Sequence, residues 1–428
     1  MRKLSKLIKE FCPNGVEYKT LGEIASISRG GSFQKKDFKK SGVPCIHYGQ
    51  IYTHYNLFAE KTLAFLSPEV AKKQKMAIKN DIIMTVTSEN VEDVCQCIAW
   101  LGEEDVAVSG HTAIIHHKQN SKYLSYWFHT AMFFKQKQKL AHGTKVIEVS
   151  PARLSDIKLP VPPIEVQNEI VRILDNFTEL TTELTTELVN RKLQYEYYRK
   201  KLLSFEYGVP YVKLNDICDI ITGYPFDSTQ FETKGVRLMR GMNIKRGKLD
   251  FSDKLNRYWK NSIGLEKYLL QAGDIVVSMD GSLVGKSYGY IEDSQLPLLL
   301  VQRVARIRTS KADKRYIYHC IASGLFSEYV EKKKTMGAIP HISLKDIANF
   351  EILLPDIDKQ KKIAGILDNF DDICSDLNIG LPAEIEARKK QYEYYRDLLL
   401  TFNRAEGNIL TDRQTDRQTD RQTDRQTD

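Results

Sequence analysis

Apolar residues recur at heptad spacing along one long stretch of the chain that contains neither Gly nor Pro. The stretch covers residues 164–205 and would be roughly 60 Å long as a helix. Its apolar positions advance by three and four residues, the spacing of a coiled-coil seam: Ile170, Ile173, Phe177, Leu180 and Leu184. We therefore predict a first spacer helix within residues 161–206.

The same seam occurs a second time, nearer the end of the chain. Its positions are Ile363, Ile366, Phe370, Ile373 and Leu377. Gly380-Leu-Pro382 follows and should stop and restart the helix, so residues 355–402 are expected to hold two helices. Each apolar stripe must be buried. An antiparallel pair formed by the two copies would achieve this, and so would packing of each helix on its own domain.

The two seams belong to a tandem duplication. Gln-Tyr-Glu-Tyr-Tyr-Arg stands at Gln194–Arg199 and at Gln391–Arg396, and Leu-Asp-Asn-Phe precedes it at Leu174–Phe177 and at Leu367–Phe370. Such self-similarity indicates one structural unit used twice. The positions shared by the copies are mostly apolar or Gly, and those that differ are mostly polar. This is typical of one scaffold that presents two different surfaces.

The segments before each long helix have a mixed pattern. Short β-branched runs at 24–27, 82–86 and 113–115 alternate with Gly, Pro and Asn, which predicts strands and turns. A helical pattern covers about 123–140, and its counterpart covers about 316–333. We predict an α+β fold with a domain at 17–160 and its homologue at 207–354, each followed by long helices that pair as an antiparallel coiled coil. Residues 1–16 should form an amphipathic helix that ends at Pro13-Asn14-Gly15.

Composition narrows the class of protein only slightly. The 428 residues are 42% hydrophobic and 28% charged, with a formal charge of +8, which fits a globular protein and weakly suggests a polyanionic partner. The seven cysteines are scattered and imply no disulfide framework. The start Met-Arg-Lys-Leu lacks an apolar signal core, and no run of about 18 apolar residues exists. A cytoplasmic location is expected.

Residues 403–428 lose the apolar pattern and end in Thr-Asp-Arg-Gln cycles from Thr411 to Asp428. Such a polar segment is expected to be disordered. A four-nucleotide unit read in triplets, as in ACA GAC AGA CAG, encodes this four-residue cycle. We therefore hypothesise a slippage-prone DNA repeat that varies the C-terminus by frameshift, a form of phase variation.

Two stretches resemble catalytic or metal-binding motifs incompletely. Gly281–Ser287 is one residue short of a phosphate-binding loop, and its repeat equivalent carries neither Gly nor Lys, so a tight loop beside a ligand surface is favoured. Cys95 and Cys97 with His116 and His117 lack a second Cys pair at zinc spacing. The sequence contains no Gly-x-Ser-x-Gly, no His-Glu-x-x-His and no Asn/Asp-Pro-Pro-Tyr/Phe motif. Binding is therefore favoured over catalysis, and no catalytic or metal-ligating residue is expected.

The first long helix also contains a smaller repeat of four residues. Thr-Glu-Leu-Thr stands at 178–181 and 182–185, and Thr-Glu-Leu-Val follows at 186–189. Four residues advance a helix by about 6 Å, which is comparable with one or two base pairs of DNA at about 3.4 Å each. The tetrads are either a ruler or plain helical sequence.

Residues 1–402 resemble the specificity (S) subunit of type I restriction–modification systems. The resemblance rests on Cys12–Tyr18, on Leu-Gly-Glu-Ile at 21–24, on both Leu-Asp-Asn-Phe segments, on both Gln-Tyr-Glu-Tyr-Tyr-Arg helices, on the tetrads and on Gly380–Lys390. It implies that each globular domain is a target-recognition domain for one half of a split, asymmetric DNA site. It also implies that the helices are spacers whose length depends on the tetrad number. The Thr-Asp-Arg-Gln tail departs from the usual pattern of this family.

The resemblance further implies a non-catalytic subunit of a restriction endonuclease and adenine methyltransferase. The expected partners are double-stranded DNA, two modification (methyltransferase) subunits and restriction (nuclease/translocase) subunits, with no membrane. No cofactor is expected in this chain, whereas S-adenosylmethionine, ATP and Mg are expected in the partner subunits. Two alternatives remain, namely the specificity subunit of a type IIB-like restriction enzyme and a coiled-coil scaffold that does not bind DNA.

Candidate DNA-binding residues lie in basic or polar loops, because Lys and Arg contact phosphates and polar side chains contact base edges. In the second domain the candidates are Arg237, Arg240, Asn243, Lys245, Arg246, Lys248 and Lys286. In the first domain they are Ser32, Gln34, Lys35, Lys36, His47, Tyr48, Gln50 and Lys145, the last in a turn whose counterpart is Gly337–His341. Four tyrosines could dock the methyltransferase or pack in the core, namely Tyr195, Tyr198, Tyr392 and Tyr395.

Overall fold

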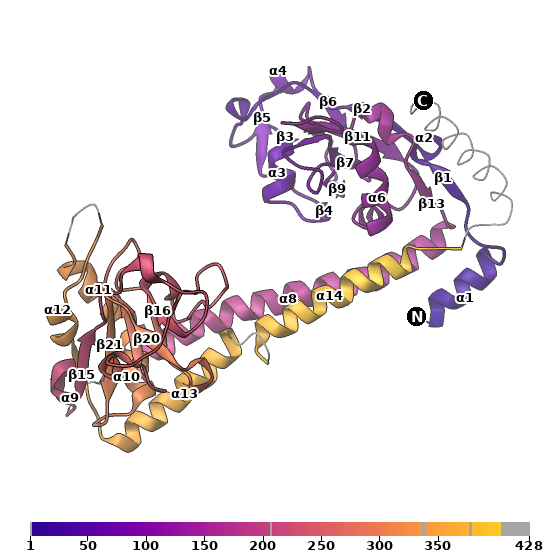
Figure 1. The fold of residues 1–428 in the computed structure, drawn as a ribbon. Coiled ribbons are helices and arrows are strands. Elements are labelled where there is room, and N and C mark those ends of the chain that lie inside the picture. The colour runs from indigo at the N-terminus through magenta and orange to yellow at the C-terminus, as the bar shows by residue number, and fades with distance from the viewer. Residues whose placement is uncertain (1, 206–207, 336–338, 376–378, 404–428) are drawn as a thin grey trace, which may run out of the picture. The chain divides into compact units, whose positions relative to one another are not determined.

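The computed structural model describes residues 2–205, 208–335, 339–375 and 379–403. The chain divides into two compact units. The first unit contains residues 1–183 and 386–428, and the second contains residues 184–385 (Figure 1). The described residues nearest both ends of the chain therefore belong to one unit.

A five-stranded sheet forms the centre of the first unit, in the order β2-β11-β7-β9-β4. Its central strands are apolar at successive positions, because both faces of the sheet are covered. Ile82 and Met84 pack with the helices, whereas Ile83 between them packs with the second sheet. The strands are β2 (Ala25–Arg29), β4 (Phe58–Ala59), β7 (Ile82–Thr85), β9 (Cys97–Trp100) and β11 (Thr112–His117).

The other elements of the first unit surround this sheet. A four-stranded sheet has the order β5-β3-β10-β6, and two strand pairs are β1-β13 and β8-β12. The strands are β1 (Tyr18–Thr20), β3 (Val43–Ile46), β5 (Ala64–Leu66), β6 (Lys75–Ala77), β8 (Thr87–Ser88), β10 (Val106–Val108), β12 (Ile147–Glu148) and β13 (Lys158–Pro160). The helices are α1 (Arg2–Phe11), α2 (Leu21–Ile24), η1 (Lys35–Asp37), α3 (Tyr48–Thr53), α4 (Pro68–Ala71), α5 (Ser121–Trp127), α6 (Ala131–Leu140) and α7 (Pro151–Leu154).

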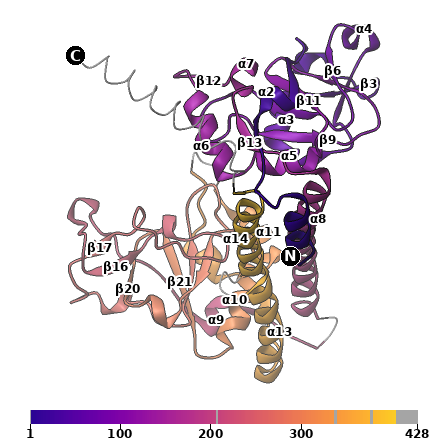
Figure 2. The same cartoon turned by 90° about the vertical axis from the view of Figure 1, so that its right-hand side faces the viewer.

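The second unit repeats this plan with a four-stranded sheet, β15-β21-β18-β19, and a three-stranded sheet, β17-β16-β20 (Figure 2). Its strands are β14 (Tyr211–Lys213), β15 (Cys218–Thr222), β16 (Val236–Met239), β17 (Tyr258–Trp259), β18 (Ile275–Ser278), β19 (Tyr288–Tyr290), β20 (Leu298–Leu300), β21 (Val304–Thr309) and β22 (Glu351–Leu353). Its helices are α9 (Leu214–Ile217), η2 (Ser228–Gln230), η3 (Gly241–Asn243), η4 (Glu266–Tyr268), η5 (Asp293–Gln295), α10 (Lys314–Ala322), α11 (Gly324–Lys333) and α12 (Leu344–Ala348). Ile275 and Val277 again face helices, and Val276 faces the smaller sheet.

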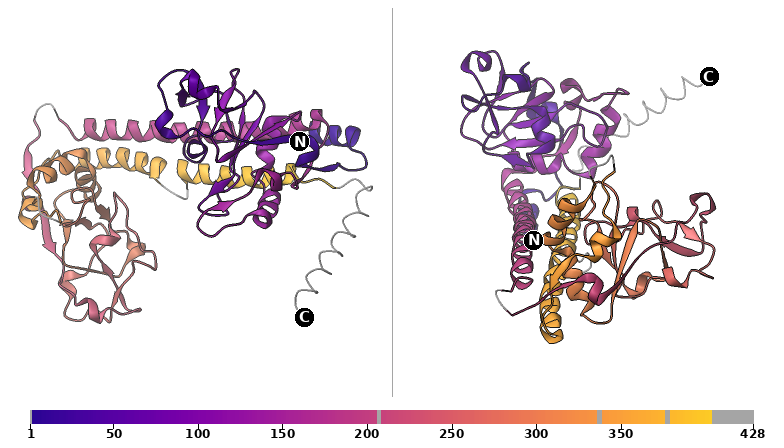
Figure 3. Two further views of the ribbon diagram at one scale, coloured as in Figure 1. Left: turned by 90° about the horizontal axis from the view of Figure 1, so that it is seen from above. Right: turned by 90° about the vertical axis from the view of Figure 1, so that its left-hand side faces the viewer.

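Three long helices complete the units: α8 (Ile164–Leu202), α13 (Ile357–Ser375) and α14 (Leu381–Leu399). In the first unit the Phe177 ring of α8 stacks on the Tyr395 ring of α14, 5.4 Å away, and the two helices lie side by side (Figure 3). In the second unit α8 and α13 are antiparallel, because Tyr195 contacts Phe370 while the later Phe205 contacts the earlier Lys359. The predicted α+β repeat with paired long helices is confirmed.

The predicted seam needs correction in the second copy. Ile366 and Ile373 are 37% and 43% exposed, whereas Ile363, Leu367 and Cys374 are buried. The contact face is therefore rotated away from a strict heptad, because the helix must also cover its own domain. Leu377 lies outside the described residues. In the first copy Ile170 and Leu174 are buried in the domain core, so both proposed ways of burying the stripe operate together.

Other predicted helix bounds also differ from the structure. The pattern at 123–140 forms two helices, because Thr130 accepts a hydrogen bond from the Phe133 amide and caps a new helix, α6. The pattern at 316–333 is likewise divided at Ser323 between α10 and α11. Helix α8 ends at Leu202 rather than at Phe205. In the described ranges no helix is long and apolar enough to cross a membrane.

Candidate nucleic-acid interface

An open hollow of about 490 Å³ lies on the first unit between helix α3 and the loop that follows β7. Two tyrosines from α3, Tyr48 and Tyr52, form one wall of this first hollow. The other lining residues are mostly polar: Thr87, Ser88, Glu89, Asn90, Asp93, Gln96, His111 and Val146. The hydroxyls, amides, carboxylates and imidazole of this lining offer both hydrogen-bond donors and hydrogen-bond acceptors.

Hydrogen bonds hold this lining in place. Tyr52 donates to the Thr87 carbonyl at 2.8 Å, and the Thr87 hydroxyl lies 3.0 Å from His111 Nδ1. Asn90 donates through Nδ2 to Asp93 at 2.7 Å and accepts from the Asp93 amide. The lining is therefore ordered before any ligand arrives, which lowers the entropic cost of binding.

His47 lies beneath this surface. Its side chain is only 7% exposed, and its ring packs against Phe38 and Tyr48. Burial first, and then the positive charge of Lys35, lowers the pKa of His47, so the ring is neutral at pH 7. His47 also caps α3, since Nδ1 accepts from the Gly49 amide. It positions Tyr48 and does not itself face solvent, contrary to the sequence-based expectation.

The remaining predicted residues of the first domain come from several segments. Gln50 accepts from the His47 amide, and Ser32 donates its amide to Gln74. Gln34 precedes η1, whose Lys35 and Lys36 are exposed. The structure brings Lys35 next to Gly49 at the start of α3. Lys145 is exposed in the turn at 143–146, and the neighbouring Val146 lines the first hollow.

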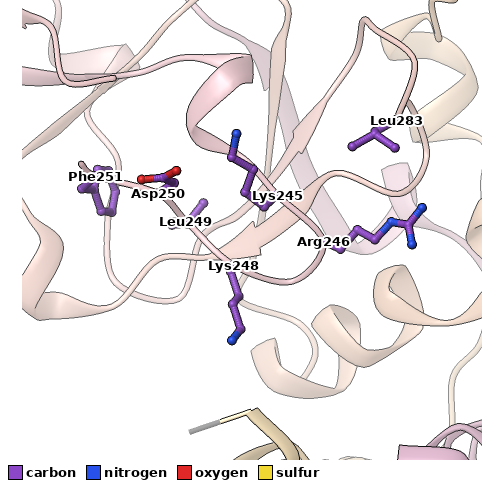
Figure 4. A pocket seen from close by; sticks show the side chains of 7 residues that line it. All are labelled: Lys245, Arg246, Lys248, Leu249, Asp250, Phe251 and Leu283. Atoms are coloured by element: carbon purple, nitrogen blue, oxygen red, sulfur yellow. The ribbon is translucent and has the colours of Figure 1, made fainter. Parts of the chain in front are cut away.

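The second unit has an open hollow of about 620 Å³ at the corresponding place, after η3 and beside the loop that follows β18. This second hollow is lined by Lys245, Arg246, Lys248, Leu249, Asp250, Phe251 and Leu283 (Figure 4). The side chains of Lys245 and Lys248 leave the loop in opposite directions (Figure 4), and Lys248 donates to the Ser375 carbonyl at 3.4 Å. The second hollow is therefore basic and partly apolar, unlike the first.

Two further arginines predicted to bind DNA lie over aromatic rings. The Arg237 guanidinium lies 4.8 Å from the Phe251 ring centre, and that of Arg240 lies 5.5 Å from the Phe231 ring. Burial, followed by repulsion from Arg257, lowers the pKa of Arg240. Asn243 is fully buried. It accepts from the Arg240 amide and donates to the Asp250 carbonyl, so it shapes the loop and does not reach solvent.

Asp280 and Arg303, which the sequence did not single out, form a cluster at the end of β18 with His341 of the predicted turn. Arg303 Nε lies 3.5 Å from Asp280, and Asp280 also pairs with His341. Arg303 has a φ of +69°, a left-handed conformation that is costly for Arg. Asp280 and Arg303 correspond to Thr87 and His111, the hydrogen-bonded pair of the first unit. No local sequence pattern marks these residues, and only alignment of the repeat with the strands reveals them.

The loop Gly281–Ser287 is not a phosphate-binding loop. It is followed by strand β19, whereas a phosphate-binding loop needs the N-terminus of a helix. Lys286 is exposed on this loop, and Leu283 lines the second hollow. The interpretation as a tight loop beside a hollow therefore fits. Residues 337 and 338 of the predicted turn Gly337–His341 lie outside the described residues.

The described residues hold no group of three or more potential metal ligands. Cys95 and Cys97 are 2% and 1% exposed, and burial raises the pKa of Cys95 to about 12. His116 pairs with Asp81 at 2.7 Å. His117 accepts from the Gln119 amide. Each of these side chains therefore has a structural role in the first domain.

The four tyrosines that could either dock a partner or pack in the core do pack within the units. Tyr195 is 5% exposed and stacks with Tyr198 around the Phe370 ring. Tyr392 lies 6.3 Å from the Tyr126 ring, and burial raises its pKa to about 12. The Tyr395 ring stacks on the Phe177 ring. The middle tyrosines of the two motifs, Tyr197 and Tyr394, are instead 61% and 65% exposed.

The structure combines a tandem α+β repeat, an open hollow on each copy and paired long helices, the architecture that the family resemblance implies. A family model described as "Type I restriction modification DNA specificity domain" matches residues 13–193 and 208–387. The chain therefore belongs to this family of type I restriction–modification specificity subunits, whose role is DNA recognition.

Two curated relatives illustrate the similarity. The type I restriction enzyme EcoR124I/EcoR124II specificity subunit of Escherichia coli is 33% identical over 304 residues, which are 67% of this chain and 72% of the relative. The type I restriction enzyme MjaVIII specificity subunit of Methanocaldococcus jannaschii is 26% identical over 78% of this chain and 81% of the relative.

Solved structures share the fold at low sequence identity. The type I restriction–modification S subunit of M. genitalium aligns with a TM-score of 0.53 and 13% identity, over 90% of this chain and 96% of that chain. A chain from a structure of the type I R-M system aligns with a TM-score of 0.61 and 15% identity, over 91% of this chain and 98% of that chain.

Proposed function

We propose that this subunit recognises a bipartite, asymmetric DNA site, with one half bound by each unit and an unread gap between the halves. One observation carries the proposal: the same scaffold places an open hollow at corresponding positions of both units, yet the linings differ in charge and polarity. Two identical surfaces would favour a palindrome. Two different surfaces favour an asymmetric site.

The chemistry of the linings suggests what each unit contacts. In the first unit, Gln96, Asn90 and the carboxylates of Glu89 and Asp93 suit the exocyclic amines of adenine or cytosine. In the second unit, Arg303 with the Lys245–Lys248 loop suits guanine edges and phosphates. Lys35, Lys36 and Lys145 would supply phosphate contacts in the first unit. Salt-dependent affinity follows from these cations.

An exposed apolar stripe on the second half of α8 suits a partner helix. Val189, Leu193 and Tyr197 follow one another at intervals of four residues and are 53%, 66% and 61% exposed. In the first unit Tyr394 and Leu398 are 65% and 49% exposed on α14. We propose that these residues, and not the four tyrosines that pack within the units, dock two methyltransferase subunits, and that restriction subunits join this complex.

The partner subunits would then supply the chemistry. We propose that this chain is non-catalytic and that S-adenosylmethionine, ATP and Mg are bound by the methyltransferase and restriction subunits. All seven cysteines are free and buried, in keeping with the proposed cytoplasmic location. The Thr-Glu-Leu-Thr tetrads lie within α8, and we propose that their number sets the gap.

Methylation sequencing tests the proposal directly. The chain is expressed with its methyltransferase in a methylation-free host, and modified adenines are mapped across the genome. A single motif of two different halves with a fixed gap is expected. Absence of DNA binding by the purified complex together with absence of a motif would favour a scaffold. A motif in a system without a helicase-like restriction subunit would favour the type IIB-like alternative.

A further inference from the structure

The aspartate of the second Leu-Asp-Asn-Phe motif joins the long helix to the recognition domain. Asp368 on α13 accepts two hydrogen bonds from Arg315, from Nε at 2.8 Å and from Nη2 at 2.5 Å. It also bonds His319 Nε2 at 2.7 Å. Both partners lie on α10 of the domain. The His319 side chain is fully buried. An ionised carboxylate only accepts hydrogen bonds, so we assign Nε2 as the ring nitrogen that donates to Asp368.

The first unit makes the same connection with different side chains. Asp175 on α8 accepts from Lys122 at 2.8 Å and from the Tyr126 hydroxyl at 2.7 Å. Lys122 and Tyr126 occupy on α5 the places that Arg315 and His319 occupy on α10. The aspartate is thus retained between the copies while both of its partners differ. This pattern indicates that the position of the carboxylate matters more than the identity of its donors.

A second attachment lies two helical turns earlier in each unit. Gln360 accepts from the Asp313 amide at 2.9 Å and donates to the Pro355 carbonyl at 2.7 Å. Gln167 accepts from the Asn120 amide at 3.0 Å and donates to the Pro162 carbonyl at 2.8 Å. Both glutamines are almost fully buried, at 3% and 1% exposure. Two points of attachment on one helix remove its freedom to pivot on the domain.

We propose that Asp175 and Asp368 are positioning residues that fix the angle between each recognition domain and its long helix, and thereby set how strictly the gap between half-sites is measured. The inference rests on the proposed bipartite function. Without the aspartate, the glutamine and the apolar packing of the helix would hold the domain less tightly, and we propose that the domain could then swing by enough to accommodate a site one base pair longer or shorter. The aspartate, about 12 Å along the helix at 1.5 Å per residue, prevents this swing.

The experiment uses the full chain in complex with its methyltransferase. Wild type, Asp368→Asn and Asp175→Asn are assayed on synthetic duplexes that carry the cognate halves with the cognate gap, one pair fewer and one pair more. Asp372→Asn is the matched control, because it removes an equal charge from an exposed position of α13. Asn keeps the shape of Asp but weakens charge-assisted hydrogen bonds.

Each aspartate variant is expected to lower the preference for the cognate gap about tenfold, the effect of about 1.4 kcal/mol. The penalties for single-base changes within either half-site should stay as in wild type, because the hollows are untouched. The control should behave as wild type in both respects. If Asp368→Asn does not assemble, Asp175→Asn decides the matter alone.

Three outcomes would overturn the inference, and they are distinguishable. Unchanged gap preference in both variants would show that the aspartates do not set the angle. Parallel loss of gap preference and of half-site specificity would show a merely structural role. Absence of any gap preference in wild type would overturn the proposed bipartite function itself.

Discussion

The ring of Tyr195 stacks on the ring of Phe370, with centroids 5.9 Å apart and planes inclined by only 10°. Tyr195 belongs to the Gln-Tyr-Glu-Tyr-Tyr-Arg motif of the first copy, and Phe370 belongs to the Leu-Asp-Asn-Phe motif of the second. The first unit contains the reciprocal contact between Phe177 and Tyr395. The two duplicated motifs therefore bind each other across the copies, which explains why both are retained.

Replacement of Phe370 by Ala should destabilise the second unit. The ring contacts Tyr195 and Tyr198, and removal of a packed aromatic side chain costs about 3 kcal/mol. Urea unfolding followed by tyrosine fluorescence measures the change. Tyr197→Ala is the control, because this exposed neighbour on α8 should change the free energy of unfolding by less than about 0.5 kcal/mol. Equal losses in both variants would contradict the prediction.

Replacement of Arg303 by Gly should raise stability and weaken DNA binding together. The φ of +69° costs a non-glycine residue about 1 kcal/mol, and the exposed pair with Asp280 contributes little. Thermal unfolding and duplex affinity of the assembled complex measure the two effects. Arg303→Asn, which also tolerates this conformation, should behave similarly. Unchanged DNA affinity in both variants would remove Arg303 from the interface.

Neutralisation of the loop that lines the second hollow should reduce the salt dependence of DNA binding. Each of Lys245→Gln, Arg246→Gln and Lys248→Gln should lower the slope of log affinity against log salt by about one for a lost phosphate contact. Lys267→Gln, at another exposed lysine of the same unit, is the control. A slope that falls equally in the control would indicate a diffuse effect of charge.

Changes in the first hollow should relax only one half of the recognised motif. His111→Ala and Gln96→Ala each remove one polar group from the lining, and loss of one base contact costs about 1–3 kcal/mol. Methylation sequencing should then show degeneracy at one or two positions of a single half-site. Degeneracy spread over both halves would mean that the hollow does not contact bases.

The first unit should lose stability as the pH falls below 6.5. Burial lowers the pKa of His117 to about 4. Between pH 6.5 and 4, His117 is protonated in the unfolded chain but not in the folded chain. The free energy of unfolding therefore decreases by up to about 3 kcal/mol as the pH falls through this range. His117→Asn, which retains the acceptor, should flatten this dependence in urea unfolding between pH 7 and 4. An unchanged slope would assign the effect to other groups.

The sequence predicted what depends on periodicity and repetition. The strands at β7 and β11, the long helix α8 and the pairing of the two copies follow from the alternation and spacing of apolar residues. The domain limits 17–160 and 207–354 stay predictions, because the compact units divide within α8 and within α14. The tail at 403–428 lies outside the described residues from 404 onward, so its predicted disorder also stays a prediction.

The candidate site was predictable as a region but not residue by residue. The hollows do lie where the loops differ between the copies, around Tyr48 and Lys245. His47 and Asn243 look like surface residues in the sequence, yet both are buried. His47 caps α3, and Asn243 is the last residue of η3 and accepts from the Arg240 amide. Conversely, His111 and Arg303 follow buried strands and carry no local signal. Tertiary folding decides which polar side chains reach solvent, and a linear pattern does not contain that information.

The hydrogen bond between Tyr18 and the Phe402 carbonyl joins residues 384 positions apart. The chain is synthesised from its N-terminus. The first recognition domain is therefore made early, but Phe177 is covered only after Tyr395 of the last helix has been made. The second unit, built from one continuous segment, can close earlier. Premature termination after residue 385 would therefore leave the earlier-made domain incomplete and the later-made one whole.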